Sequence, residues 1–484
     1  MRALADVLLD MGWIVTGSDV APFSLPATDS GEAQSLRRMP SLQSRRLHTH
    51  CGHSAEHLGP RTDLVVFSSA VPPDNPELRR AQELGIPTLN YAQMLGRLVE
   101  GRRGLAVAGT HGKSTTAAMV ARIFVQAARD PTFVFGATPL GMSSGGRAGQ
   151  GDAVIVEACE YRGNFLHLRP QHAAILGIEH DHFDCYGSFE AVEQAFRQFA
   201  AMLPADGLLV VRHDCPAMYP AHSQCRAPRH TECAGYTHAP TAVDPPAPGP
   251  RRVETFGLHA DADWCATDLS HESGRYRFQV LCHGKPMGEA VLRVPGRHNV
   301  LNALAAAALA HANGIVPEQI LSGLAGFRGL QRRLEELGTY AGVTVVDDYA
   351  HHPTEISASL SAVRLMFPGR RVCCVFQPHQ ASRTDRLLGE LGASLQNADR
   401  VLVADIFRAR EGPARPGEVG SADVASQVRA GGTDAPGVHS LEGIAEFLDN
   451  TLRPGDVLVA MGAGDIGRIA HGYVDRFREN CAAG

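Results

Sequence analysis

The sequence contains almost no lysine. Of its 45 Lys and Arg residues only Lys113 and Lys285 are lysines, so arginine supplies nearly all of the positive charge. A net charge of −6 and a pI near 6.4 exclude a general attraction to nucleic acid. A lysine in such a chain favours a phosphate-binding role, because its compact point charge suits a phosphate site.

CxxC pairs and long apolar runs are also missing. The eleven cysteines are odd in number and scattered, which argues against disulfides and zinc ligands and predicts small core residues in a reducing compartment. No window reaches the roughly 18 apolar residues of a membrane span, and the first residues carry acidic groups without a signal-peptide cleavage site. We therefore expect a cytoplasmic protein that does not insert into the membrane.

The length and the element pattern predict several domains. At 484 residues, with 44% hydrophobic and 20% charged residues, the chain exceeds one ordinary core and has a globular composition. Alternating strands and helices predict an α/β fold in three domains at residues 1–100, 101–326 and 327–484. The last is predicted to be a doubly wound, Rossmann-like sheet with strands at 343–346, 372–376, 401–404 and 457–460.

The N-terminal domain has the pattern of a truncated Rossmann-like unit. A helix over 1–12 and a strand over 13–19 fit the helix and second strand of a βαβ unit, but the first strand and its Gly-rich turn are missing. We expect the natural start to lie upstream of Met1, the alternative being a domain that does without them. A further strand over 63–69 and a helix from Asn75 continue the pattern.

The segment 105–115, LAVAGTHGKST, organises the chain. Four apolar residues predict a buried strand, the glycines let the backbone approach an anion, and the amides opening the next helix donate to phosphate oxygens. Lys113 is expected to neutralise phosphate charge and Ser114 to ligate Mg²⁺. The spacing is shorter than the usual P-loop pattern, so a structural Gly turn is the alternative.

Polar groups follow the predicted strands at one edge of each sheet. Glu157 and Glu160 end one apolar run of the central domain, and residues 179–182 (EHDH) end another. Because ligands lie beyond the carboxyl ends of parallel strands, these groups are expected to gather beside the phosphate loop. A hairpin is predicted around 283–285, and the Pro-rich stretch 239–250 predicts a surface loop, while Cys225, His230, Cys233 and His238 fit no zinc-site spacing.

These motifs, in this order, resemble the Mur ligase family, whose members add amino acids to the bacterial cell-wall precursor. The resemblance covers nearly the whole chain and is closest to the alanine-adding branch. It rests on the following segments: 109–115 (GTHGKST), 157–160 (EACE), 178–184 (IEHDHFD), 296–303 (GRHNVLNA), 332–333 (RR), 347–355 (DDYAHHPTE), 377–379 (QPH) and 383–384 (RT). Departures at Gly177, Cys159, Gln380 and Phe407 affect individual substrate contacts.

The resemblance implies a role for each matched position. The ATP-binding set is Gly109, Thr110, His111, Gly112, Lys113, Ser114 and Thr115 in the loop, with His298, Asn299 and Asn302 at the adenosine end. Ser114, Glu157 and His182 are implied as Mg²⁺ ligands. The catalytic set comprises Lys113, Arg333, Asp348 and His351, and the substrate-facing residues are His379 and Arg383. Arg332 has the alternative of an ordinary surface charge, and His351 or His352 that of a helix cap.

The resemblance further implies an ATP-dependent ligase that joins L-alanine to the carboxylate of UDP-N-acetylmuramate through an acyl phosphate, as a monomer or homodimer. Chemically, the γ-phosphate turns a poor electrophile into a mixed anhydride whose leaving group is phosphate. No lysine lies between Lys113 and Lys285, so the carbamylated lysine of several relatives has no counterpart in this stretch. Three alternatives stay open, namely a ligase that attaches a preformed tripeptide, a P-loop NTPase, and a nucleotide-binding regulator without catalysis.

Overall fold

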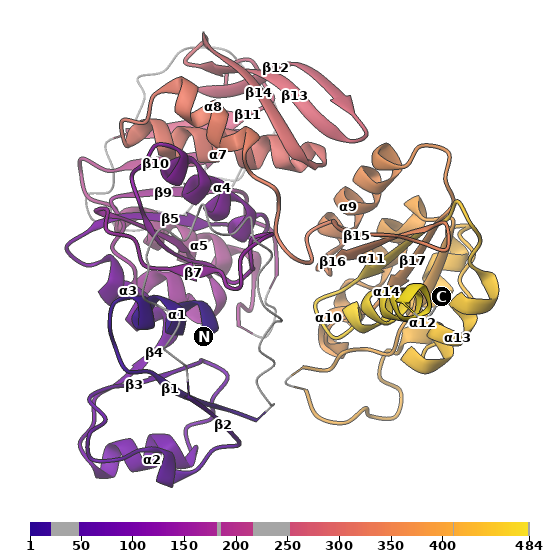
Figure 1. Ribbon diagram of the computed structural model, residues 1–484, viewed down its shortest axis with the longest axis horizontal. Coiled ribbons are helices and arrows are strands. Elements are labelled where there is room, and N and C mark those ends of the chain that lie inside the picture. The colour runs from indigo at the N-terminus through magenta and orange to yellow at the C-terminus, as the bar shows by residue number, and fades with distance from the viewer. Residues whose placement is uncertain (21–47, 182–184, 216–251, 410, 483–484) are drawn as a thin grey trace. The chain divides into compact units, whose positions relative to one another are not determined.

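The computed structural model describes residues 1–20, 48–181, 185–215, 252–409 and 411–482 (Figure 1). The chain divides into two compact units. The first consists of residues 1–268, 278–290 and 301–327, and the second of 269–277, 291–300 and 328–484. Parallel sheets covered by helices occur in both units, which confirms the predicted α/β class. None of the helices in the described part of the chain has the length and hydropathy of a membrane span.

A ten-stranded sheet has the order β14-β13-β12-β11-β10-β9-β5-β8-β6-β7, and all of it belongs to the first unit except residues 269–272, 275–277 and 291–295 of β12, β13 and β14. Its centre is parallel, with β5 between β8 and β9, and these three strands are almost wholly buried because helices cover both faces. The strands are β5 (Arg103–Ala108), β6 (Thr132–Val134), β7 (Gly146–Arg147), β8 (Ala153–Glu157), β9 (His172–Ile175), β10 (Leu208–Arg212), β11 (Arg252–Gly257), β12 (Trp264–Glu272), β13 (Arg275–Cys282) and β14 (Lys285–Pro295).

Helices on this sheet follow the predicted apolar faces. On one face α4 packs so tightly on α8 that a Cβ at Gly323 would lie 2.6 Å from the Cα of Ile123. The predicted hairpin around 283–285 is confirmed by the adjacent strands β13 and β14. The helices of this unit are α1 (Arg2–Asp10), α2 (Pro76–Glu83), α3 (Tyr91–Val99), α4 (Lys113–Gln126), α5 (Phe189–Ala201), α7 (Arg297–Ala312) and α8 (Pro317–Ala325), with 3-10 turns η3 (Ala55–His57) and η4 (Tyr161–His167).

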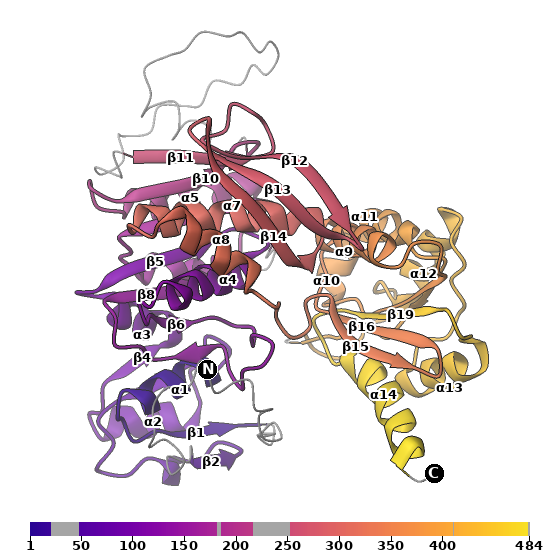
Figure 2. The same ribbon diagram turned by 45° about the horizontal axis from the view of Figure 1, so that its top comes forward.

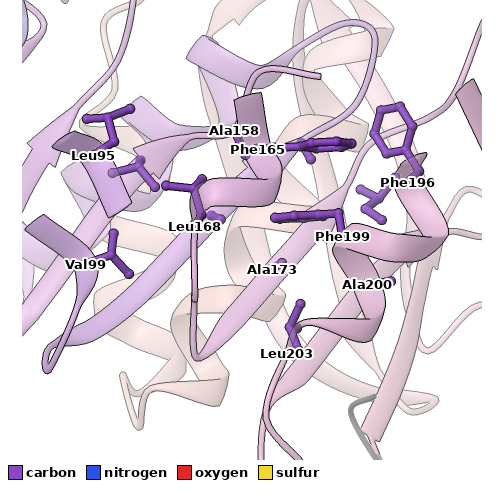
Figure 3. Packing of buried hydrophobic residues seen from close by; sticks show 14 of the residues in the cluster. Leu95, Val99, Ala158, Phe165, Leu168, Ala173, Phe196, Phe199, Ala200 and Leu203 are labelled. Carbon is purple, nitrogen blue, oxygen red and sulfur yellow. The ribbon is translucent and has the colours of Figure 1, made fainter. Parts of the chain in front are cut away.

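The opposite face carries an aromatic core (Figure 3). Phe165 of η4 stacks on Phe199 of α5 with ring centroids 4.8 Å apart, and Phe196 meets Phe165 edge-on at 5.1 Å. Leu4, Val7 and Leu8 of α1 belong to the same buried cluster as residues of β8 and β9. The helix predicted for the N-terminal domain therefore packs its apolar face on the central sheet.

The remaining N-terminal strands form two separate parallel pairs among the described residues. β1 (Thr16–Asp19) pairs with β2 (His48–Cys51), and β3 (Val65–Phe67) pairs with β4 (Thr88–Asn90). The strand predicted over 13–19 begins only at Thr16, because Trp13 and Ile14 make no ladder and Ile14 is 96% exposed.

The second unit contains a five-stranded sheet in the order β15-β16-β19-β17-β18, in which only β15 is antiparallel. Figure 2 labels its strands β15, β16 and β19. Successive residues of each strand point to opposite faces, so Cys373 packs under α13 and α14 and Cys374 under α9, α11 and α12. The doubly wound prediction is confirmed. The elements are β15 (Glu335–Tyr340), β16 (Val343–Asp348), α9 (Pro353–Met366), β17 (Val372–Phe376), α10 (Ala381–Arg386), α11 (Leu388–Ser394), η6 (Leu395–Asn397), β18 (Arg400–Val403), α12 (Ser421–Ala430), α13 (Leu441–Thr451), β19 (Val457–Met461) and α14 (Gly467–Ala482).

Candidate functional site

The loop between β5 and α4 is a glycine-dependent turn at the carboxyl end of a buried strand. Gly109 has φ 132° and Gly112 has φ 80°, a region that only glycine enters at low cost. A Cβ at Gly109 would meet the backbone nitrogen of Leu176 at 3.0 Å, and one at Gly112 would meet Oδ1 of Asn302 at 2.6 Å. Helix α4 then begins at Lys113, so its first amide groups face the loop as an anion site requires.

The segment after β9 holds this loop in place. Thr110 donates its backbone N–H to the carbonyl of Gly177 at 2.9 Å, and its hydroxyl accepts the N–H of Glu179 at 2.9 Å. Nε2 of His111 lies 3.4 Å from a carboxylate oxygen of Glu179. The loop and the segment 176–181 therefore form one rigid edge of the sheet, as the motif positions predict.

The Lys113 side chain is 13% exposed and turns back onto its own loop. Its Nζ donates to the carbonyls of Gly109 at 2.5 Å and Thr110 at 3.0 Å, and lies 3.0 Å from a carboxylate oxygen of Glu160. Burial favours the neutral amine, but Glu160, with Cys159 and Glu157, outweighs it and raises the pKa of Lys113. The position of Glu160 beside the loop was predicted, but its pairing with Lys113 was not.

Ser114 and Glu157 come together as the magnesium prediction requires. The Ser114 hydroxyl donates to Oε2 of Glu157 at 2.8 Å, and the same oxygen accepts the N–H of Gly136 at 2.9 Å. A hydroxyl and a carboxylate at the mouth of a phosphate loop are oxygen donors suited to Mg²⁺ beside a nucleotide. The third predicted ligand, His182, lies outside the described residues, as does the cluster from Cys225 to His238. Thr115 lies in the first turn of α4.

Helix α7 brings Asn302 to the loop, where its Oδ1 approaches Gly112. Asn299, almost one turn earlier, donates its side-chain amide to the carbonyl of Pro295 at 2.6 Å. Burial lowers the pKa of His298 to about 4, so its imidazole is neutral at physiological pH. His298 and Asn299 belong to the second unit and Asn302 to the first, so α7 connects the two.

In the second unit Asp348 ends β16 as a buried carboxylate. Its oxygens accept the N–H groups of Leu334 at 2.7 Å and Ala350 at 2.6 Å. Burial raises the pKa of Asp348 to about 6, against the opposing effect of these N–H groups and of Arg333. Arg333 lies over the ring of Tyr349, 4.9 Å from its centroid, and 3.7 Å from a carboxylate oxygen of Glu355. The pKa of Asp348 therefore lies near the pH range in which a carboxylate can act as a general base.

An aromatic row lies next to Asp348. The ring of His351 meets His379 edge-on, with centroids 5.8 Å apart, and His379 stacks on Phe407 at 5.8 Å. Nδ1 of His351 lies 3.2 Å from Glu355. The neighbouring His352 accepts the N–H of Thr354 and caps α9, which separates the two histidines that the sequence left undecided. Arg383 is buried in α10, following the turn that begins at His379.

A polar network at the carboxyl ends of β1 and β2 was not predicted. Glu77 of α2 accepts the hydroxyl of Ser18 at 2.7 Å and lies 2.8 Å from Nδ1 of His57. The same hydroxyl is 3.0 Å from Nδ1 of His53. Despite burial, the hydrogen bonds from His57 and Ser18 lower the pKa of Glu77. The run of histidines from His48 to His57 was the sequence signal for this cluster.

Comparison with known proteins identifies one family throughout. Three family descriptions match: "Mur ligase family, catalytic domain" over 38–103, "Mur ligase middle domain" over 107–310 and "Mur ligase, glutamate ligase domain" over 332–464. A UDP-N-acetylmuramate–L-alanine ligase of Desulfitobacterium hafniense is 39% identical over 86% of both chains. That of Oleidesulfovibrio alaskensis is 37% identical over 98% of this chain and 96% of its own. The crystal structure of a UDP-N-acetylmuramate–alanine ligase from Thermotoga maritima superposes with a TM-score of 0.76, at 26% identity over 99% and 97% of the chains.

Proposed function

The chain belongs to the Mur ligase family, and we propose that it joins L-alanine to the carboxylate of UDP-N-acetylmuramate in an ATP-dependent reaction. The observation that carries the proposal is the loop in which Lys113 and the Ser114–Glu157 pair lie together at one sheet edge. The alanine-adding relatives, which match almost the full chain, support the choice of substrates. ATP dependence is a property of the family.

The phosphate loop supplies the charge balance for nucleotide binding. The loop amides other than that of Thr110, which is bound to Gly177, and the Lys113 ammonium donate to the phosphates, and Asn302 lies beside Gly112. From the resemblance, His298, Asn299 and Asn302 are proposed to contact the adenosine end. Ser114, Glu157 and His182 are the proposed Mg²⁺ ligands. The ion supplies neutralisation of the triphosphate, and the residues named here fix where that charge is held.

The proposed reaction has two balanced steps. A carboxylate oxygen of the muramoyl group attacks the γ-phosphorus, the bond to the β-phosphate oxygen breaks, and ADP leaves. The alanine ammonium first loses one proton, and the resulting amine attacks the acyl carbon. As the acyl–oxygen bond breaks and phosphate leaves, the nitrogen loses a second proton, which phosphate can carry, whereas the first proton needs a base in the site. Asp348, with its pKa raised to about 6 by burial, and His351 are the candidate acceptors of that proton. Arg333 is proposed to stabilise charge at the reacting centre, and His379 and Arg383 to contact the muramoyl and alanyl groups.

We further propose that the three sequence regions divide the work. Residues 1–100 bind the UDP-sugar, 101–326 bind ATP, and 327–484 bind the amino acid and complete the ligation. Polar side chains at the carboxyl ends of β1 and β2, including Ser18 and His53, support the first assignment, because ligands of open parallel sheets lie at this edge. The cytoplasmic location and the monomeric or dimeric state stay predictions.

The acyl phosphate gives the sharpest test. UDP-N-acetylmuramate labelled with ¹⁸O in its carboxylate is incubated with ATP, Mg²⁺ and L-alanine, and the released phosphate is examined by mass spectrometry. We expect one ¹⁸O per phosphate and a product heavier by one alanyl residue. Unlabelled phosphate together with unchanged sugar nucleotide would indicate simple ATP hydrolysis and refute the ligase proposal.

A further inference from the structure

Arg332 is partly buried, with its side chain 31% exposed, and makes specific contacts within the second unit rather than being an ordinary surface charge. Its Nη2 donates to the carbonyl of Gly462, in the turn between β19 and α14, at 2.8 Å. Its Nε lies 3.5 Å from Oδ2 of Asp347, and the guanidinium covers the ring of Tyr349, 5.3 Å from the centroid. One side chain therefore joins the end of β16 to the turn that begins α14.

Asp347 is the buried carboxyl group at the centre of this contact. It is 0% exposed, and neither of its carboxylate oxygens has a hydrogen-bond partner of normal length among the described residues. Besides Arg332, Nε2 of His471 lies 3.6 Å from Oδ2, and a Cβ at Gly467 would lie 3.1 Å from it. A buried carboxyl group in this state is stabilised by nearby positive charge, which here comes from Arg332 and the first turn of α14, and from His471 at pH values where its imidazole is protonated.

The backbone of residues 332–334, which carries the Arg332 side chain, also contacts Asp348. Arg332 and Leu334 have φ of 56° and 48°, a backbone region that is unfavourable for non-glycine residues. The carbonyl of Arg332 accepts the N–H of Tyr349 at 2.7 Å, and Leu334 donates to Asp348 at 2.7 Å. The hydrogen bond to Asp348 thus comes from a strained turn that needs an anchor, and the Arg332 side chain provides one.

We propose that Arg332, Asp347 and His471 are positioning residues that hold the turn 332–334 so that the Leu334 N–H stays on the Asp348 carboxylate. The proposal rests on the proposed function in one respect, the placement of Asp348 at the reacting centre. An N–H donor favours the ionised carboxylate, so release of the turn makes Asp348 harder to ionise.

The ionisable groups around Asp348 and His471 determine how the proposed effect depends on pH. Asp348 faces Arg333 and Glu355, and the thiol of Cys374 on β17, whose pKa is raised by burial, so that the thiol stays neutral. His471 faces Asp347, Glu335 and Asp475, and its pKa is raised chiefly by Asp347. The pairing of His471 with Asp347 therefore weakens as pH rises, whereas Arg332 stays charged throughout.

Variants at Arg332 separate positioning from general structure. In L-alanine-dependent phosphate release from pH 5 to 9, Arg332→Met is expected to move the acid limb of kcat upward by at least half a pH unit. It should lower kcat more than it changes KM for ATP. Arg332→Lys should restore most of the wild-type profile and His471→Gln should give a smaller shift in the same direction. Arg478→Gln, which removes a different positive charge from α14, is the matched control and should leave the pH profile of kcat unchanged. A uniform loss at all pH values in Arg332→Met would overturn the proposal.

A stability measurement tests the proposal without relying on enzymatic activity. The difference in unfolding free energy between wild type and Asp348→Asn, followed from pH 4 to 8, reports the ionisation of Asp348. With Arg332→Met in both proteins, this pH-dependent difference should extend to higher pH, and an unchanged pH range contradicts the proposal. If wild type releases no alanine-dependent phosphate, the proposed function fails, while this measurement still tests the anchoring of the turn.

Discussion

Lys113 of the phosphate loop forms an ion pair with Glu160, which follows β8; Nζ lies 3.0 Å from the carboxylate, and the two side chains are 13% and 3% exposed. Two loop carbonyls share the same ammonium. The lysine proposed to bind phosphate is thus held in place by a protein anion before nucleotide arrives, and phosphate must compete with or supplement that anion.

Replacement of Glu160 by Gln leaves the largely buried Lys113 charge with only neutral acceptors. We expect a loss of about 3 kcal/mol in unfolding free energy, as for other broken buried pairs. Part of it should be recovered when Mg²⁺–ATP supplies a new anion, so nucleotide should raise the Tm of the variant more than that of wild type. Glu83→Gln removes an exposed pair with Arg80 and serves as control, with a change below about 1 kcal/mol. Equal nucleotide-induced shifts in variant and wild type would refute this account.

Gly112 tests the backbone of the loop. An alanine there is strained at φ 80° and meets Asn302 at 2.6 Å, so Gly112→Ala should weaken ATP binding by at least about tenfold and destabilise the fold by about 1–2 kcal/mol. Gly314 has φ 73° but open space around a Cβ, so Gly314→Ala should show a similar strain cost with unchanged ATP affinity. Calorimetric titration measures the ATP affinity of both variants. Equal affinities would argue against a close approach at Gly112.

Ser114 and Glu157 test the metal proposal. Loss of either oxygen donor, in Ser114→Ala or Glu157→Gln, should raise the Mg²⁺ concentration for half-maximal activity roughly 10- to 100-fold. Ser188→Ala removes the N-cap of α5 and should lower stability by about 1 kcal/mol while leaving the Mg²⁺ dependence unchanged. An Mg²⁺ titration of phosphate release gives the answer, and unaltered half-saturation in both site variants would remove them from the metal site.

Asp348 makes stability depend on pH. Burial raises its folded-state pKa to about 6, above the ordinary value of 3.8, so the folded protein holds this proton more tightly than the unfolded chain. Its contribution to stability is complete below about pH 4 and is lost as pH rises through 6. Asp348→Asn should abolish this part of the pH dependence and the activity with it. Urea unfolding at several pH values measures the effect, and parallel curves for the two proteins would contradict it.

Local pattern predicted the strands and the main loop well. The apolar runs of β16, β17 and β19 and the Lys113–Ser114–Glu157 set were all placed from sequence, because buried parallel strands and glycine-rich turns leave local signals. β2, β6, β7, β10, β11, β12 and β15 were not predicted. β15 is a half-exposed antiparallel edge without a strong apolar period, whereas β10 is a buried parallel strand whose apolar run was overlooked.

The remainder of the site depends on tertiary contacts. The pairing of Lys113 with Glu160 joins residues 47 apart, and Arg332 reaches Gly462 across 130 residues. The positive φ angles at Arg332 and Leu334 could not be predicted, because neither residue is a glycine. Sequence reasoning could therefore name the chemistry of the site but not the residues that hold it in place.

The most direct test of the central claim is phosphate release by the purified protein with ATP, Mg²⁺ and UDP-N-acetylmuramate. L-alanine, a preformed tripeptide and no acceptor are compared. The account predicts release that depends on both L-alanine and the sugar nucleotide and falls to background without either. Release that is independent of any acceptor, or that needs the tripeptide instead, would contradict it.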